Sequence, residues 1–182
     1  MQKHIMALSM IVMLTISFIV KADAPGSIVE IMLGANLDEA RGYCLDIAGG
    51  KGANAPLDKG LQAHTCYHYT GGILEDQGFD GALISKGQFR ISYFGVCMSA
   101  QSFTTSSALS LAKCDQSDEQ KFLLKPNGYL VTQKAPELCV TVSSAKKKEG
   151  RGGSPVHVMR PLTLESCDDV KKTYQAWILN EL

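Results

Sequence analysis

The chain has the sequence YCLDI at Tyr43–Ile47, followed by LQAHTC at residues 61–66 and QGF at residues 77–79. These segments share a plan: a cysteine in an apolar run, a second cysteine five residues after a leucine, and a Gln-x-aromatic triplet. The plan returns as VCMSA, LSLAKC and QKF within residues 96–122, and as LCVTV, LTLESC and QAW within residues 138–177. A short unit that cannot bury its apolar face alone is usually stacked with its neighbours, so three copies predict a closed threefold assembly.

All six cysteines lie inside the three copies, two in each copy. An even number of cysteines in an exported chain predicts disulfides. The repeat favours the simplest of the possible pairings, with one bridge in each copy: Cys44–Cys66, Cys97–Cys114 and Cys139–Cys167. Each bridge closes a loop of about 20 to 30 residues, which stabilises the fold by about 3 kcal/mol through loop-closure entropy.

The N-terminus has the pattern of an export signal. Lys3 precedes an almost wholly apolar run at residues 5–20, and Lys21 closes the run. The run is shorter than the roughly 20 residues that a membrane span needs, so it fits a secretory signal peptide better than the alternative, a membrane anchor. We predict cleavage after Ala22, with cleavage after Ala24 as the alternative. The mature protein is then expected to be secreted, with no membrane insertion.

Composition excludes several classes of function. Eighteen basic residues balance eighteen acidic ones, and loss of Lys3 and Lys21 with the signal leaves a net charge of about −2. No general attraction to nucleic acid or anionic membranes follows. The chain has no Gly-x-Ser-x-Gly, His-Glu-x-x-His, Cys-x-x-Cys or glycine-rich phosphate motif. We therefore predict a protein that is not an enzyme and uses no cofactor.

Short strands are predicted along the whole mature chain. Ile28–Leu33 and residues 89–93 and 129–132 are apolar or β-rich segments that precede the first cysteine of each copy. Residues 109–112 and 162–165 alternate apolar and polar side chains, as half-buried strands do. Helical periodicity never extends beyond two turns, and about 160 mature residues favour one domain. The sequence therefore predicts an all-β fold.

These landmarks resemble the ricin-type β-trefoil lectin family over about residues 26–182, essentially the whole mature chain. The paired cysteines, CLDI at residues 44–47 and QAW at residues 175–177 carry the resemblance, in register with the other two triplets. Two triplets end in Phe instead of Trp, which keeps an aromatic core residue. The resemblance implies a β-trefoil of three pseudo-equivalent lobes with one disulfide each, at about residues 26–83, 84–125 and 126–182, after a signal peptide at residues 1–22.

The resemblance also implies structural roles for the triplets. Phe79, Phe122 and Trp177 are expected to pack together near the pseudo-threefold axis, each burial being worth roughly 1.5–3 kcal/mol. A buried glutamine must be hydrogen-bonded, so Gln120 and Gln175 are expected to bond the backbone and not a ligand.

Members of the family bind sugars in a shallow pocket in each lobe. The positions that match this pocket in the first copy hold Asp46, Gln62, His64 and Asp76, with Gln77 beside them. Asp46 is expected to accept hydrogen bonds from two sugar hydroxyls, Gln62 to donate and accept, and His64 to cover the C–H face of the sugar.

The other two copies depart from this set and lack the carboxylate after the first cysteine. Their residues at the four positions are Ser99, Ser110, Ala112 and Glu119, and Thr141, Thr163, Glu165 and Tyr174. Neither set provides a good platform for a sugar ring, so we expect one working site and two vestigial lobes.

The sequence thus predicts a secreted lectin that binds glycans or glycoproteins, with the family's preference for galactose-like or N-acetylgalactosamine-containing ligands. A single site binds a monosaccharide weakly, so crosslinking requires an oligomer. Two alternatives remain: a trefoil used for protein contact, as an inhibitor or ligand-like module, and a targeting subunit of a toxin or hydrolase.

Two further features are interpreted as structural. His64, Cys66 and His68 share a strand face, but a disulfide-bonded Cys66 has no thiolate, so no metal site is expected. The lysine-containing insertion at residues 143–155 of the third copy is expected to be a solvated surface loop, with a heparin or phosphate site as the alternative.

Overall fold

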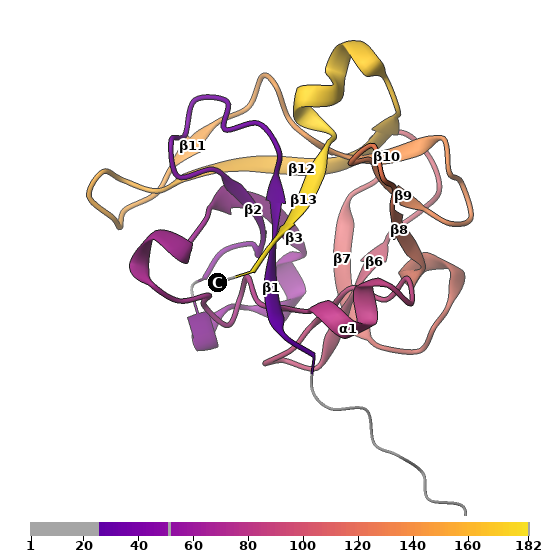
Figure 1. Cartoon of the computed structure of the whole chain (residues 1–182), viewed down its shortest axis with the longest axis horizontal. Helices are drawn as coiled ribbons and strands as arrows, with labels where there is room; N and C mark the ends of the chain where they lie inside the picture. The colour runs from indigo at the N-terminus through magenta and orange to yellow at the C-terminus, as the bar shows by residue number, and fades with distance from the viewer. Residues whose placement is uncertain (1–25, 51, 182) are drawn as a thin grey trace, which may run out of the picture.

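The structure, a computed structural model, describes residues 26–50 and 52–181. These residues form thirteen short strands in one antiparallel sheet that curls on itself (Figure 1). The predicted signal peptide and both of its cleavage points lie outside the described residues. Within the described part of the chain, no helix combines the length and apolar character that crossing a membrane requires.

Four strands come from the first copy, four from the second and five from the third. Their bounds are β1 Ile28–Leu33, β2 Tyr43–Ile47, β3 Leu61–Thr65, β4 Phe79–Asp80, β5 Arg90–Ile91, β6 Val96–Ala100, β7 Leu109–Lys113, β8 Phe122–Leu124, β9 Leu130–Thr132, β10 Leu138–Val142, β11 Lys148–Glu149, β12 Val158–Ser166 and β13 Trp177–Asn180. One α-helical turn, α1 (Gly81–Ile84), follows β4. Short 3₁₀ turns occupy Gly52–Asn54, Leu57–Lys59, His68–Thr70, Asp118–Gln120 and Asp169–Tyr174. The all-β prediction is confirmed.

The two cysteines of each copy lie on one antiparallel hairpin: β2 with β3, β6 with β7, and β10 with β12. In each hairpin the first cysteine lies opposite the residue two positions before the second cysteine: His64 for Cys44, Ala112 for Cys97 and Glu165 for Cys139. All three predicted disulfides are confirmed: Cys44–Cys66, Cys97–Cys114 and Cys139–Cys167.

Two strand pairs join the third copy to the first. β13 pairs with β1, from Leu33 opposite Trp177 to Glu30 opposite Asn180, so the C-terminal strand closes against the N-terminal one. The long strand β12 pairs with β10 on one edge and with β3 on the other. Side chains of the first and third copies therefore lie side by side along β3 and β12.

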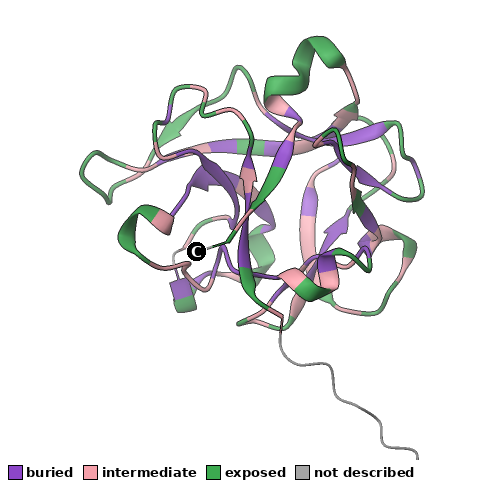
Figure 2. Cartoon of the chain, in the orientation of Figure 1, coloured by how far each residue is buried: buried purple, intermediate pink, exposed green. Residues whose placement is uncertain are grey.

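The aromatic residues of the triplets lie in the core. Phe79, Phe122 and Trp177 are fully buried and belong to one hydrophobic cluster. Figure 2 shows that buried residues lie mainly on the strands of the curled sheet. The indole Nε1 of Trp177 donates a hydrogen bond to the carbonyl oxygen of Val140 (2.9 Å), so its polar group is satisfied inside the core.

The triplet glutamines are also buried, and each one clasps the chain around the second cysteine of its own copy. The side-chain oxygen of Gln120 accepts from the Asp115 N–H (3.0 Å), and its amide nitrogen donates to the Lys113 carbonyl (2.8 Å). Gln77 and Gln175 make the equivalent pairs of bonds at 2.9 to 3.2 Å. The three buried glutamine amides thus provide hydrogen-bond partners for backbone groups at the end of a strand.

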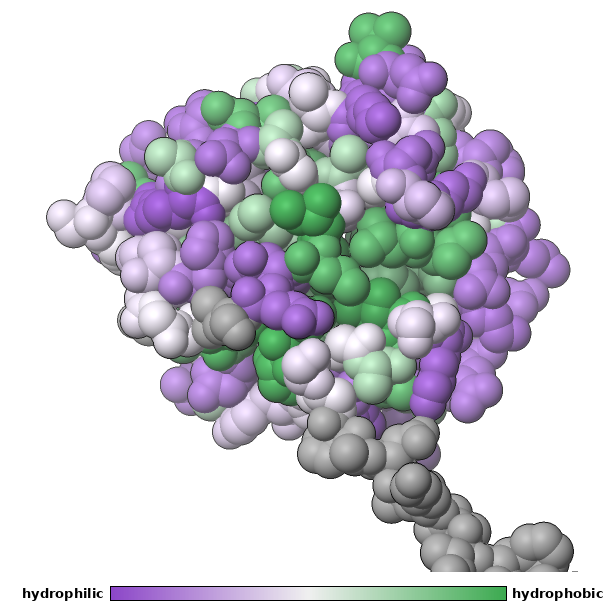
Figure 3. Space-filling model, viewed as in Figure 1, coloured by the Kyte–Doolittle hydropathy of each residue, from purple (hydrophilic) through white to green (hydrophobic). Residues whose placement is uncertain are grey.

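One face of the molecule carries both apolar and hydrophilic regions. Apolar side chains gather near its centre (Figure 3), the part of the view in which β1 and β13 lie in Figure 1. Hydrophilic side chains cover the side on which the hairpin of β11 and β12 extends.

Candidate functional site

A cavity of about 490 Å³ lies where β3 of the first copy meets β12 of the third; we call it the first-copy cavity. Glycine backbone forms part of its wall. The side chains that line it come from β3 and the residue two after it, from the segment that begins β12, and from the β11–β12 hairpin: Gln62, His64, Tyr67, His157, Met159, Lys148 and Arg151.

Asp46 lies beneath this cavity and does not face it. It stands opposite Gln62 in the β2–β3 ladder and is fully buried. Its Oδ1 accepts from Gln62 Nε2 (2.8 Å), and its Oδ2 accepts from Gln77 Nε2 (3.0 Å). Burial, together with the nearby charge of Asp76, raises the pKa of Asp46 well above its usual value. Asp46 therefore orients the amide of Gln62, whose Oε1 has no hydrogen-bond partner among the described residues.

Asp76 and Gln77 are likewise fully buried below the cavity. Asp76 Oδ2 accepts a hydrogen bond from the Gly52 N–H (2.7 Å), while its Oδ1 is buried without a partner among the described residues. Burial raises the pKa of Asp76 to about 6. Of the five predicted site residues, only Gln62 and His64 line the cavity. Asp46 bonds Gln62, Gln77 bonds Asp46 and the Thr65 carbonyl, and Asp76 bonds the backbone of Gly52.

His64 belongs to a group of three rings that we call the ring cluster: His64, Tyr67 and His157. The His64 ring centroid lies 5.3 Å from that of Tyr67 and 5.1 Å from that of His157, the latter edge-on. His64 Nδ1 donates to the Thr65 carbonyl (2.8 Å), since a carbonyl only accepts. Burial lowers the pKa of His64 to about 4, so the imidazole is neutral near pH 7.

The insertion of the third copy completes the cavity and is tied to the first copy. Within it, β11 pairs with β12, placing Lys148 opposite Met159. Arg41 donates to the carbonyls of Pro155 (2.9 Å) and Val156 (2.8 Å), and Lys147 forms an ion pair with Asp38 (2.8 Å). The insertion is exposed along nearly its whole length and is partly ordered by backbone pairing.

The contribution of the third copy was not predicted from the sequence. Lys148, Arg151, His157 and Met159 are distant in sequence from Gln62, and only the pairing of β12 with β3 brings them together. The one available signal was the insertion itself, which interrupts the third copy between its two cysteines.

The equivalent positions of the third copy also line a cavity, of about 360 Å³. Thr141, Thr163, Glu165 and Tyr174 all contribute to its wall. Their polar groups already bond nearby: Thr141 Oγ1 accepts from Gln175 Nε2 (2.9 Å), and Thr163 Oγ1 donates to Glu165 Oε1 (2.8 Å). A tyrosine ring is present, but at the position that Asp76 holds in the first copy.

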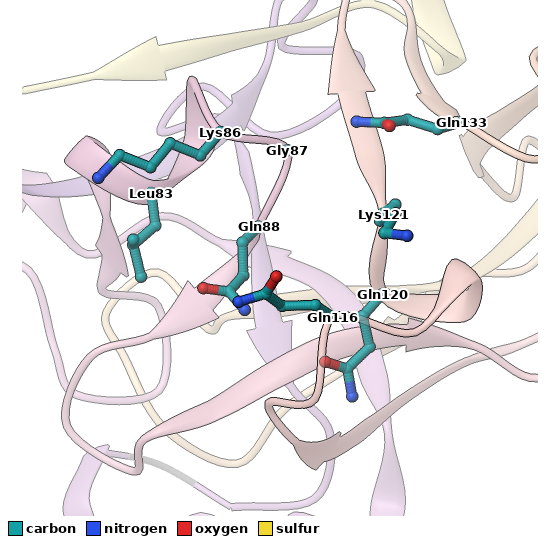
Figure 4. A pocket seen from close by; sticks show the side chains of 8 residues that line it. All are labelled: Leu83, Lys86, Gly87, Gln88, Gln116, Gln120, Lys121 and Gln133. Carbon is teal, nitrogen blue, oxygen red and sulfur yellow. The ribbon is translucent and has the colours of Figure 1, made fainter.

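A different cavity, of about 430 Å³, lies between the end of α1 and the start of β8 (Figure 4). It is lined mainly by amides and two lysines, and no aromatic ring contributes to its wall: Gln88, Gln116, Gln120, Gln133, Lys86 and Lys121. The amides of Gln120 and Gln133 already donate to backbone carbonyls (2.8 and 3.1 Å). Without a ring to cover an apolar face, this cavity suits a sugar less well than the first-copy cavity does.

The three hairpin copies and the closed antiparallel sheet define a β-trefoil. The family model of the ricin-type β-trefoil lectin domain matches residues 35–177, and the chain belongs to this family. Domains of this family are carbohydrate-binding modules and not catalytic ones.

Solved structures show the same fold at low sequence identity. A designed threefold-symmetric protein, ThreeFoil, has a TM-score of 0.59 at 18% identity, over 85% of this chain and 99% of its own. The C-half of the earthworm R-type lectin, in complex with GalNAc, has a TM-score of 0.55 at 12% identity, over 86% and 99%. The cytolethal distending toxin of Actinobacillus actinomycetemcomitans has a TM-score of 0.56 at 19% identity, over 88% and 94%. The search of curated proteins finds no match.

Proposed function

We propose that this protein is a secreted lectin that binds galactose-like or N-acetylgalactosamine-containing glycans in the first-copy cavity. The observation that carries the proposal is the ring cluster standing beside the amide of Gln62. Rings can cover the apolar C–H face of a sugar while an amide pairs with its hydroxyls, and a small site needs both. The preference for galactose-like sugars rests on the family, one of whose structures, the earthworm lectin half, contains GalNAc.

The buried carboxylates act indirectly in this proposal. Gln62 presents Oε1 to a sugar hydroxyl because Asp46 holds Nε2 from below. His64 donates through Nδ1 to Thr65, which leaves Nε2 as an acceptor in the neutral ring. Gln77 anchors Asp46 and the end of β3 at once, so the positions of Gln62 and His64 depend on Asp46 and Gln77.

Secretion is the second part of the proposal. Three disulfides favour an oxidising compartment, and the predicted signal at residues 1–22 supplies the route. A nearly neutral composition supports glycans or glycoproteins as partners over nucleic acid or membranes.

The test is binding of the oxidised mature protein to a glycan array, beside Asp46→Asn and Gln62→Ala. The asparagine introduced in the first variant has only one acceptor oxygen, so the amide of Gln62 must turn and present Nε2 to the ligand instead of Oε1. We expect Gln62→Ala to lose about tenfold or more in affinity because a sugar hydroxyl loses its partner. Asp46→Asn should lose a similar amount because a hydroxyl that donates to Oε1 meets an N–H donor instead. Ser110→Ala, at the matching position of the second copy, is the control and keeps full binding.

Each alternative result has a definite meaning. Binding that persists in both variants moves the site away from the first-copy cavity. Absence of binding to every glycan, with unchanged melting temperatures, favours a trefoil that contacts proteins.

A further inference from the structure

The first-copy cavity has a one-sided charge. Lys148 and Arg151 line it from the hairpin, and no Asp or Glu is among the described residues that line it. The nearest carboxylate below it, Asp46, is fully buried and covered by its bond to Gln62. An exposed carboxylate would accept charge-assisted hydrogen bonds from sugar hydroxyls, and the described residues that line this cavity offer none.

The cations that surround the cavity differ in how they are paired. Lys147 pairs with Asp38 at 2.8 Å, and Arg160 pairs with the same carboxylate at 2.9 Å. Arg41 pairs with Glu39 at 2.7 Å. By contrast, the side chains of Lys148 and Arg151 have no ion pair or hydrogen bond in the described part of the chain. The cations that hold the hairpin are therefore paired with carboxylates, whereas Lys148 and Arg151, which face the cavity, are available to a ligand.

The ring cluster provides the other half of a ligand surface. His64 and Tyr67 are almost fully buried, and His157 is held edge-on to both of them. Tyr69 Oη lies 2.8 Å from His157 Nε2, so the third ring is fixed by a hydrogen bond. Rings that are already ordered lose little conformational entropy when a ligand packs on them.

We propose that the first-copy cavity takes an acidic saccharide, a galactoside that carries a sulfate on its ring or a carboxylate on an attached acidic sugar. Lys148 and Arg151 bind the anionic group, and the ring cluster covers the C–H face of the sugar. Arginine forms paired charge-assisted hydrogen bonds with either anion, and lysine adds a point charge. This inference rests on the proposed lectin function and adds to it the charge class of the ligand.

The test compares three ligands on the oxidised mature protein by calorimetry: lactose, 3′-sulfolactose and 3′-sialyllactose. We expect at least one acidic ligand to bind about fivefold or more tightly than lactose, because each charge-assisted bond is stronger than a neutral one. The preferred acidic ligand tells whether sulfate or carboxylate is the natural group. In about 0.5 M salt the advantage should largely disappear, since both cations are solvent-exposed.

Variants of this site separate the cations from the rest of the cavity. Lys148→Gln with Arg151→Gln should remove most of the advantage of the acidic ligand over lactose. Lys113→Gln, a single charge change on β7 in the second copy, should retain it. Equal affinity of the wild type for neutral and acidic ligands, or an advantage that survives in the double variant, overturns the acidic-ligand inference. If no ligand binds, here or on the array, the lectin proposal fails as well.

Discussion

His64 is the residue at which the first and third copies meet. It lies on β3 opposite Met159 of β12, and its ring contacts both Tyr67 and His157. Burial is the main reason why its pKa falls to about 4, with the charges of His157 and Arg41 adding to the effect. A residue that the sequence placed as a sugar platform is therefore also a buried group whose protonation opposes folding.

The sign of the resulting pH dependence follows from linkage. The folded pKa of about 4 lies below the unfolded value of 6.5, so the unfolded chain binds a proton that the folded chain excludes. The contribution of neutral His64 to the free energy of unfolding is therefore present above pH 6.5 and is lost as the pH falls toward 4. Between about pH 7 and pH 5 it amounts to about 2 kcal/mol.

Between pH 7 and pH 5, the free energy of unfolding should fall by about 2 kcal/mol more in the wild type than in His64→Gln. Denaturant titrations of both proteins at the two pH values measure the difference. The raised pKa of Asp76 acts in the opposite direction. It stabilises the fold as the pH falls toward the pKa that Asp76 has in the unfolded chain. Asp76 is present in both proteins, so its effect cancels. Identical pH dependence in the two proteins would contradict the assignment.

At the scale of elements, the repeat is expressed as a hairpin plus a glutamine clasp. In each copy the disulfide and the triplet glutamine fasten the same strand end, one through sulfur and one through two backbone hydrogen bonds. The glutamine of each triplet therefore has a structural role, as the aromatic residue of the triplet does.

Gln120→Ala tests this clasp in the copy without a proposed ligand. The substitution leaves the Asp115 N–H and the Lys113 carbonyl without their partner, and we expect a loss of about 2 kcal/mol. Gln116→Ala, at an exposed position nearby, should change stability by less than about 0.5 kcal/mol. Urea unfolding followed by tryptophan fluorescence measures both. A Gln120→Ala protein as stable as the Gln116→Ala control would mean that water replaces the clasp at no cost.

The same elements show what the sequence could and could not reveal. Cysteine pairs, the main hairpin strands and the trefoil class follow from a local repeat, because each hairpin is formed by residues that are close in sequence. The segment at residues 89–93 forms only the two-residue strand β5, which pairs with β4 and β6. The pairing of β3 with β12 depends on closure of the whole sheet. A repeat implies this closure but does not determine which residues of β3 and β12 lie opposite one another.

The site was partly predictable for the same reason. Gln62 and His64 lie in the first copy; the pocket positions of the resembled family, compared among the three copies, selected them. The burial of Asp46 depends on Gln62 folding over it, and the contribution of Lys148 depends on an insertion that the other copies lack. Which side chains cover others, and which copies contact one another, is determined only when the whole sheet closes, so a local repeat does not reveal it.

At the scale of the whole molecule, the open question is how many copies bind. The second copy has only Ser99, Ser110, Ala112 and Glu119 at the matching positions, with no ring among them. The third has a cavity with Tyr174, in which the Thr163 hydroxyl already donates to Glu165 and the Thr141 hydroxyl already accepts from Gln175. Sites whose polar groups are already paired gain little from a sugar hydroxyl. The number of useful sites per monomer is therefore expected to be one.

A one-site protein binds a glycan surface but does not crosslink it. We expect the oxidised monomer, checked by gel filtration, to bind beads coated with the preferred glycan without agglutinating them, with one ligand per chain in calorimetry. A biotinylated protein assembled on streptavidin should agglutinate the beads, because linked sites gain roughly 10²- to 10⁴-fold in avidity without any new contact. Agglutination by the monomer would instead require a second site, and its loss in Tyr174→Ala would locate that site in the third-copy cavity.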